Sequence, residues 1–367
     1  MMLASSSVAS PRIVGVGTAN PKSAYSQDDI LTRYGIDDER IGSLFRNSHI
    51  DQRFLHLPDV DPAGGPVAET QGQLLERHRS QGIEMAGRAL RACLARAEAD
   101  VDDIRYLCCV SSTGFLTPGF SALLIRELGL RRDCGRMDVV GMGCNAGLNG
   151  LNPVAAWAAA NPGDLAVMIC IEVCSAAYVF DGTMRTAVVN SLFGDGAAAV
   201  AVRAGGATGP GAASGPAIGD GSAVILKFAS RLIPEAIGAM RFDWDDTQHK
   251  NSFFLDRDIP YVVGAHAEET LESLLAGTGV RRDEISHWIA HSGGKKVIDS
   301  VKINLGLTAY DLRHTISVLR NYGNLSSGSF LFSYEQLMEE GRVARGDYGV
   351  LMTMGPGSTI EMALVQW

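Results

Sequence analysis

The feature that most constrains the fold of this chain is an internal repeat, with an offset of about 180 residues between its two copies. Three pairs of segments, each combining an apolar strand or turn with glycine or small polar residues, occur in the same order in both copies: 102–114 with 283–294, 141–147 with 322–328, and 193–202 with 354–365. We interpret the chain as a duplicated βαβ domain whose two sheets pack into one body. The expected halves are residues 1–203 and 223–367, joined by a Gly/Ala-rich surface connection at 204–222.

Short apolar segments alternate with helical patterns within the first half. Residues 106–111, 137–141 and 165–171 are continuously apolar, which is typical of strands buried on both faces of a sheet. Residues 121–128 and 151–160 carry helical patterns. Strands that alternate with helices indicate an α/β fold class.

Composition and charge exclude several classes of protein. The 367 residues are 46% hydrophobic, which supplies a large core, and the net charge of −9 disfavours a nucleic-acid partner. The first residues lack the basic region of a signal peptide, and no apolar stretch is long enough for a membrane span, so we expect a cytoplasmic protein without membrane association. Seven cysteines without a CxxC pair indicate free thiols rather than a disulfide framework or zinc site.

The strongest chemical signal is the string GMGCNAG at residues 141–147. A buried strand is expected to end at Gly141, glycines permit a tight turn, and a helix is expected to begin near Cys144. A thiol at a helix N-terminus lies at the positive end of the helix dipole, which favours the thiolate. A neighbouring backbone N–H could stabilise an oxyanion. Most cysteines are simply small buried residues, but this setting favours a nucleophile.

A histidine and an asparagine occupy related positions in the second half. His291 follows the apolar strand of WIAHSGG, at the strand end where open α/β sheets bind ligands. Asn324, in YGNLSSGS, matches the nucleophile loop in the internal repeat and lies between a glycine and an expected helix. Alone, His291 could be a structural histidine and Asn324 a helix N-cap. Together, Cys144, His291 and Asn324 on three strand-end loops favour catalysis near a pseudo-twofold axis.

Several strings in this chain resemble one known family across nearly its whole length. They are GCNAG, LFGDGAAA, WIAHSGG, YGNLSSGS and GVLMTMGPGSTIE. They are similar to the chalcone-synthase-like type III polyketide synthases. The strings GFLTPG, MRTAVVNSLFGDG and AHSGGKK further resemble a bacterial branch that supplies an aromatic precursor for glycopeptide antibiotics.

The resemblance implies a thiolase-like α/β fold, with duplicated βαβ halves forming a layered αβαβα core. It also implies that Cys144 carries the growing acyl chain as a thioester, which is nucleophilic catalysis. His291 and Asn324 would stabilise the enolate that forms when malonyl-CoA loses carbon dioxide. This chemistry requires no metal and no redox cofactor, since CoA thioesters are the substrates.

The resemblance assigns further residues to the substrate cavity and to partners. Phe193 and Phe253 would separate a CoA tunnel from the reaction chamber, and Ala177 replaces a chamber threonine that is common in chalcone-forming relatives. Thr117 stands where those relatives place a methionine that reaches into the partner's chamber, so a homodimer is implied. The candidates for contacts with the CoA phosphates are Arg53, Lys295 and Lys296, and the alternative is that the lysines are ordinary solvated surface residues. A crotonase-fold dehydratase is a possible functional partner.

Other members of the same fold are less compatible with the sequence. Ketoacyl-carrier-protein synthases carry His-Gln-Ala-Asn where this chain has His291 followed by Ser-Gly-Gly. Thiolase uses a second cysteine near the C-terminus, and no cysteine follows Cys174. Two alternatives stay open: a chalcone- or alkylresorcinol-type synthase with a bulkier starter, and a catalytically silent subunit that shapes an active partner.

Overall fold

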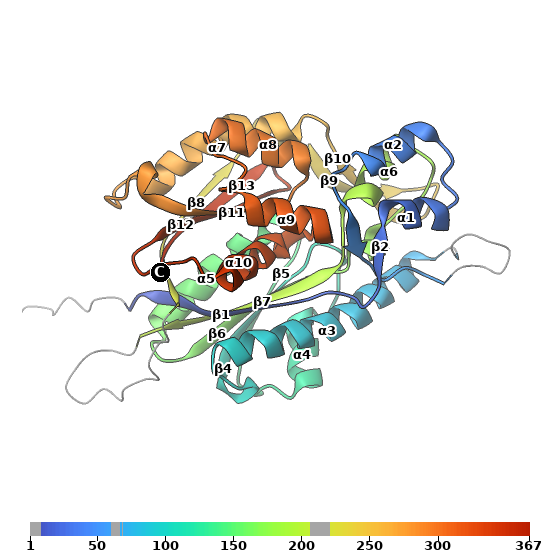
Figure 1. Cartoon of the computed structure of the whole chain (residues 1–367). Coiled ribbons are helices and arrows are strands. Elements are labelled where there is room, and N and C mark those ends of the chain that lie inside the picture. Colours follow the sequence, from blue (N-terminus) through green and yellow to red (C-terminus); the bar gives the residue numbers. More distant parts are fainter. Residues whose placement is uncertain (1–8, 60–66, 68, 206–220) are drawn as a thin grey trace, which may run out of the picture.

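The computed structural model describes residues 9–59, 67, 69–205 and 221–367. Within these residues, nine strands form one hydrogen-bonded sheet in the order β11-β12-β13-β8-β1-β7-β6-β4-β5 (Figure 1). Their bounds are β1 Pro11–Ala19, β4 Ile104–Val110, β5 Gly135–Val139, β6 Leu165–Glu172, β7 Gly196–Ala204, β8 Ala223–Leu232, β11 Ile285–Ala290, β12 Tyr348–Gly355 and β13 Thr359–Gln366. The connection expected at 204–222 falls mostly on residues 206–220, which lie outside the described residues.

The strand order reproduces the duplication expected from the repeat. Outward from the β1–β8 junction, the order is β1-β7-β6-β4 in the first half and β8-β13-β12-β11 in the second. In each half the first two pairings are antiparallel and the third is parallel. One feature differs from the expectation of two separate sheets. Arg12 and Ile13 pair with Val224 and Ala223, so a short edge contact joins both halves into one sheet.

Helices form three layers around the two halves of the sheet (Figure 1). α5 (Ala146–Ala160) and α10 (Ser329–Glu340) contact strands of both halves and form the central layer. α3 (Gln71–Arg96) and α4 (Phe120–Leu128) cover the outer face of the first half. α7 (Ile259–Leu275) covers the outer face of the second half, α8 (Lys295–Asn304) packs against α7, and α9 (Arg313–Tyr322) packs against α10. The resulting order confirms the αβαβα layering.

Strand β6 shows why the core strands are continuously apolar. Leu165 and Val167 belong to the hydrophobic cluster beneath α3 and α4, whereas Ala166 and Met168 belong to the cluster around α5 and α10. Successive side chains of a strand point to opposite faces, so a strand covered by helices on both faces needs apolar residues at every position.

The remaining elements gather at one end of the layered core (Figure 1). They are α1 (Gln27–Arg33), α2 (Glu39–Arg46), α6 (Met184–Leu192), the β2–β3 pair (Ala24–Ser26 and Gln52–Phe54) and the β9–β10 pair (Met240–Asp245 and Lys250–Leu255). α6 packs against both α2 and β10, so these elements form a wall beside the loops that follow the core strands. No helix in the described part of the chain is both long and apolar enough to cross a bilayer.

Candidate active site

The loop between β5 and α5 has the geometry that its glycines predict. Gly141 and Gly143 have φ values of 78° and 67°, a left-handed backbone that favours glycine. A Cβ on Gly143 would also lie 2.3 Å from Cδ of Pro356, so a larger residue would not fit. This turn leads directly into the short 3-10 helix Gly143–Asn145 and then into α5. Cys144 therefore lies at the N-terminal end of a helix, with 6% of its surface exposed.

His291 and Asn324 are positioned by backbone hydrogen bonds to neighbouring segments. His291 directly follows β11, and its N–H donates to the carbonyl of Met352 in β12 over 2.8 Å. Asn324 follows α9, and its N–H donates to the carbonyl of Leu192 at the end of α6 over 2.9 Å. The N–H of Gly194 donates in return to the Asn324 carbonyl, also over 2.9 Å. Both side chains are buried.

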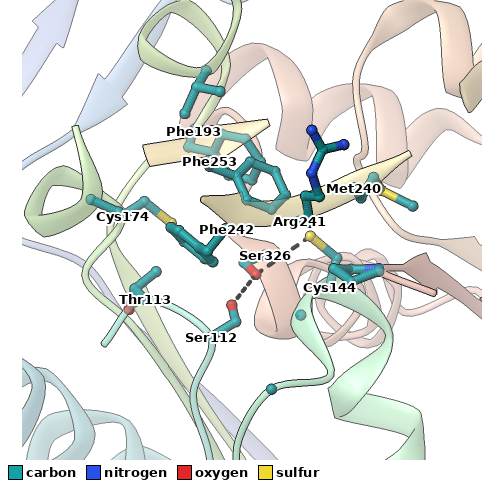
Figure 2. A pocket seen from close by; sticks show the side chains of 15 residues that line it. Ser112, Thr113, Cys144, Cys174, Phe193, Met240, Arg241, Phe242, Phe253 and Ser326 are labelled. Atoms are coloured by element: carbon teal, nitrogen blue, oxygen red, sulfur yellow. Dashed lines mark hydrogen bonds between the residues drawn. The ribbon is translucent and has the colours of Figure 1, made fainter. Parts of the chain in front are cut away.

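Two cavities meet at Cys144. The larger has a volume of about 550 Å³ and is lined by Cys144, His291 and Asn324. The smaller has a volume of about 320 Å³ and also reaches Cys144 (Figure 2). The larger cavity thus brings together three residues that lie far apart in the sequence, and the smaller cavity gives a second approach to Cys144.

Phe193 and Phe253 lie where the cavities meet, since both residues line both cavities. Their rings face each other edge-to-face, with centroids 5.8 Å apart and an interplanar angle of 90° (Figure 2). Ala177 lines only the smaller cavity. Thr117 is exposed in the loop before α4 and, among the described residues, lines neither cavity of its own chain.

Burial controls the ionisation of the nucleophile and its neighbour. It raises the pKa of the Cys144 thiol to about 12, although a hydrogen bond with Ser326 acts against that rise. Burial also lowers the pKa of His291 to about 3. Both shifts favour the uncharged forms, a neutral thiol and a neutral imidazole. The prediction of a thiolate considered only the helix N-terminus and left out this cost of desolvation.

A chain of hydrogen bonds links Cys144 to the buried carboxyl group of Glu172, and Figure 2 shows its first two links, through Ser326 and Ser112. Cys144 Sγ lies 3.4 Å from Ser326 Oγ, which lies 2.7 Å from Ser112 Oγ. Ser112 Oγ donates to Glu172 Oε1 over 3.0 Å. Ser326 has a φ of 49°, a strained value for a non-glycine residue, and its N–H donates to Asn324 Oδ1 over 2.8 Å. Because Oδ1 is occupied, the Asn324 NH₂ group is the end available to a ligand.

Comparison with known proteins shows the family to which these features belong. Residues 4–206 match the family model for the N-terminal domain of chalcone and stilbene synthases, and residues 226–367 match the C-terminal domain. The chain belongs to the chalcone and stilbene synthase family.

Individual relatives cover nearly the whole chain. A protein from Streptomyces toyocaensis named 3,5-dihydroxyphenylacetyl-CoA synthase is 64% identical over 97% of this chain and 90% of its own length. A protein of the same name from Amycolatopsis balhimycina is 62% identical over 97% of this chain and 93% of its own. The crystal structure of PKS-I from the brown alga Ectocarpus siliculosus has a TM-score of 0.87 and 24% identity, and covers 99% of both chains. That likeness confirms the predicted fold class.

Four cationic residues line the larger cavity, and the sequence analysis named two of them. Lys295 and Lys296 line this cavity, as do Arg40 of α2 and Arg257, which sequence reasoning missed. Neither arginine belongs to a recognisable motif, and the two lie far apart in the chain, so only the fold brings them together. The interpretation of Arg53 as a CoA contact is wrong. Arg53 has no exposed surface, and protein groups surround its guanidinium.

Glu172 should make the stability of the protein depend on pH near neutrality. Burial raises its pKa from 4.5 to about 7, while hydrogen bonds from Ser327 and Ser112 act against the rise. Between about pH 4.5 and pH 7, Glu172 has lost its proton in the unfolded chain but keeps it in the folded protein. The free energy of unfolding therefore falls as pH increases. We expect the fall between about pH 4.5 and pH 7 to amount to roughly 3 kcal/mol.

Glu172→Gln should lack this dependence, because glutamine does not titrate. The measurement is chemical unfolding of both proteins at several pH values from about 5 to 8. The exposed Glu235→Gln serves as the control, and should follow the pH dependence of the parent chain. Equal pH dependence in Glu172→Gln and the parent chain would mean that Glu172 retains an ordinary pKa.

Proposed function

We propose that this chain is a type III polyketide synthase that condenses four malonyl-CoA units and cyclises the product to 3,5-dihydroxyphenylacetyl-CoA. The observation that carries the proposal is the identity of 64% and 62%, over 97% of the chain, to two proteins named for that product. The pathway context is the supply of dihydroxyphenylglycine for glycopeptide antibiotics.

Cys144 is the proposed nucleophile. Its sulfur attacks the carbonyl carbon of a CoA thioester, the CoA sulfur leaves, and the acyl group remains on Cys144. Since burial keeps the resting thiol protonated, the proton must leave during the attack. His291, a neutral imidazole in the same cavity, is the proposed acceptor of this proton.

His291 and Asn324 are proposed to stabilise the enolate. Malonyl-CoA loses carbon dioxide, and the electron pair of the broken C–C bond moves into an enolate whose charge lies largely on the thioester oxygen. Asn324 can donate its NH₂ group to this oxygen, and its Oδ1 contact with Ser326 N–H supports that orientation. A neutral amide suits the task, because it donates a hydrogen bond without transferring the proton.

Carbon–carbon bonds then form in repeated cycles. The enolate carbon attacks the thioester on Cys144, which releases the thiolate and leaves the lengthened chain on CoA. Three extensions give a tetraketide, whose terminal carbon attacks the ketone nearest the thioester, and loss of one water gives the aromatic ring. The smaller cavity beside Cys144 is the proposed chamber, which raises the rate of ring closure by holding the chain folded. Ala177 contributes a small side chain to its wall.

The larger cavity is the proposed CoA site. Four cationic residues line it, whereas Asp256 is the one carboxylate among its described lining residues. The cations are Arg40, Arg257, Lys295 and Lys296. Positive side chains attract phosphate groups even when the chain as a whole is negative. Phe193 and Phe253, at the boundary of this cavity, are proposed to restrict passage into the chamber.

The proposed assembly and setting follow the family. We propose a cytoplasmic homodimer in which Thr117 faces the partner's chamber, with a crotonase-fold dehydratase as a functional partner. The proposed reaction needs no metal, because hydrogen-bond donors stabilise the enolate. It needs no redox cofactor, because the conversion of malonyl-CoA to the product involves no net oxidation or reduction.

Product analysis with malonyl-CoA as the sole substrate tests the proposed function. We expect carbon dioxide release and, after thioester hydrolysis, the mass of 3,5-dihydroxyphenylacetic acid. Addition of a dehydratase of the crotonase fold should accelerate formation of the ring. A strict requirement for an added aromatic or long-chain acyl-CoA would instead support the chalcone- or alkylresorcinol-type alternative.

A further inference from the structure

Arg53 is an unusual residue in this structure. It lies in β3, has no exposed surface, and takes part in none of the ion pairs found among the described residues. Placing a charge in a protein interior is costly unless hydrogen bonds compensate it. The buried Asp195 favours the charge of Arg53 only at longer range than an ion pair, so hydrogen bonds supply the direct compensation.

The guanidinium of Arg53 binds the end of one helix. Nη1 donates to the carbonyls of Asn190 and Phe193 over 2.6 and 2.8 Å, and to the Tyr178 hydroxyl over 2.9 Å. Nη2 donates to Gln27 Oε1 over 2.7 Å. The Tyr178 hydroxyl itself donates to the Phe193 carbonyl. Asn190 and Phe193 belong to the last turn and C-cap of α6, where carbonyls lack helical partners and a positive charge is favourable.

The other carbonyls at this helix end are also occupied. The side-chain amide of Gln27 donates to the Ser191 carbonyl over 2.8 Å. The Leu192 carbonyl accepts the backbone N–H of Asn324 over 2.9 Å. Arg53, Gln27 and the Asn324 backbone thus bind successive carbonyls of one helix end. The position of Asn324 is consequently tied to the position of α6.

Arg53 also packs against the turn that precedes Asn324. Gly323 has a φ of 74°, and a Cβ on it would lie 2.8 Å from Arg53 Cδ and 2.7 Å from the Leu192 carbonyl oxygen. The stem of Arg53 and the end of α6 therefore occupy the space beside this glycine. One side chain contacts both segments that carry site residues, namely Phe193 at the boundary of the cavities and Asn324 in the larger cavity.

We propose that Arg53 is a positioning residue, whose buried guanidinium holds the end of α6 so that the Phe193 ring and the Asn324 amide keep their places. This inference rests on the proposed function, because it assigns Arg53 a part in the condensation and chain-length control of the same site. Displacement of a reacting group by about 1 Å can lower a rate by about 10²-fold. Loss of Arg53 should thus impair extension more than loading of Cys144.

Three substitutions test this role. Arg53→Met keeps the length of the side chain but removes the donors, Arg53→Lys keeps the charge, and Tyr178→Phe removes one hydroxyl at the same helix end. In Arg53→Met we expect kcat for the aromatic product to fall about 10²-fold, a larger share of shorter released chains, and acylation of Cys144 within about twofold of the parent chain. For Arg53→Lys and Tyr178→Phe, we expect values of kcat and shares of shorter chains between those of Arg53→Met and those of the parent chain. Tyr178→Phe also keeps the test valid if Arg53→Met does not fold.

Hydrogen exchange measured by mass spectrometry provides a readout of position. The amides of Asn324 and Gly194, whose bonds join the two segments, should exchange faster in Arg53→Met, while amides of β6 keep their protection. Leu90→Ala, on the buried face of α3 and outside the lining of both cavities, supplies a loss of stability for comparison.

Two results would overturn the proposal. One is a normal product distribution with normal exchange at Asn324 in Arg53→Met. The other is the same change of products in Leu90→Ala at an equal loss of thermal stability. Neither result concerns the proposed function itself, which fails only if the parent chain makes no aromatic product from malonyl-CoA.

Discussion

Cys144→Ala is expected to abolish covalent loading by malonyl-CoA and to lower product formation by roughly 10³-fold or more, because the atom that receives the acyl group is removed. The fold should persist. The change deletes one buried sulfur atom, and such small truncations in a core typically cost about 1 kcal/mol. The measurement is the mass of the intact protein after incubation with malonyl-CoA, together with product analysis.

A second cysteine provides the control for this experiment. Cys174 is also buried and lines the smaller cavity, yet it is not part of the larger one (Figure 2). Cys174→Ala should retain loading, since we assign it no covalent role. An acyl group that stays bound to Cys144→Ala, and is lost from Cys174→Ala, would transfer the nucleophile assignment to Cys174.

His291→Ala and Asn324→Ala should separate the two hydrogen-bond donors by their effects on loading and decarboxylation. Loss of either donor should slow malonyl-CoA decarboxylation by about 10²–10³-fold, because the enolate oxygen loses one stabilising contact. Alkylation of Cys144 by iodoacetamide should slow only in His291→Ala, since we assign proton acceptance to the imidazole and not to the amide. Both rates can be measured on the same preparations, as carbon dioxide release and as thiol modification.

Asn324→Asp refines this comparison, because it keeps the shape of the side chain but replaces the NH₂ group with an acceptor. It should slow decarboxylation at least as strongly as Asn324→Ala, since an acceptor would face the negative enolate oxygen. If iodoacetamide reactivity decreases equally in His291→Ala and Asn324→Ala, the proposed division of roles is incorrect.

The architecture was predictable because it follows from local patterns that occur twice. The apolar strands expected at 106–111 and 165–171 correspond to β4 and β6, and the strand expected at 137–141 corresponds to β5 with slightly shifted ends. Helices cover β4 and β6 on both faces, which explains why these strands are almost continuously apolar. The expectation of burial on both faces was wrong for β5, because β5 is the edge strand of the sheet and its residues are exposed or half-buried. The edge pairing of β1 with β8 was not predictable, since two residue pairs leave no pattern in the sequence.

The candidate site was predictable where chemistry and turn geometry coincide. Cys144 follows glycines with left-handed backbones, Asn324 follows another, and His291 ends an apolar strand. Such positions place side chains at the edge of a sheet, where ligands bind. The prediction for Arg53 failed because an arginine in a short segment is normally exposed, and nothing local reveals that helix α6 ends against it.

The sequence by itself therefore determined the duplicated α/β fold, the family, and the three side chains proposed for catalysis. Tertiary structure decided the rest of the site. It decided that burial favours the neutral forms of Cys144 and His291, that burial raises the pKa of Glu172, and that Arg53 donates hydrogen bonds to a helix end. The physical reason is that burial and hydrogen bonding depend on contacts with residues from distant parts of the chain, whereas turns and strand patterns depend on adjacent residues.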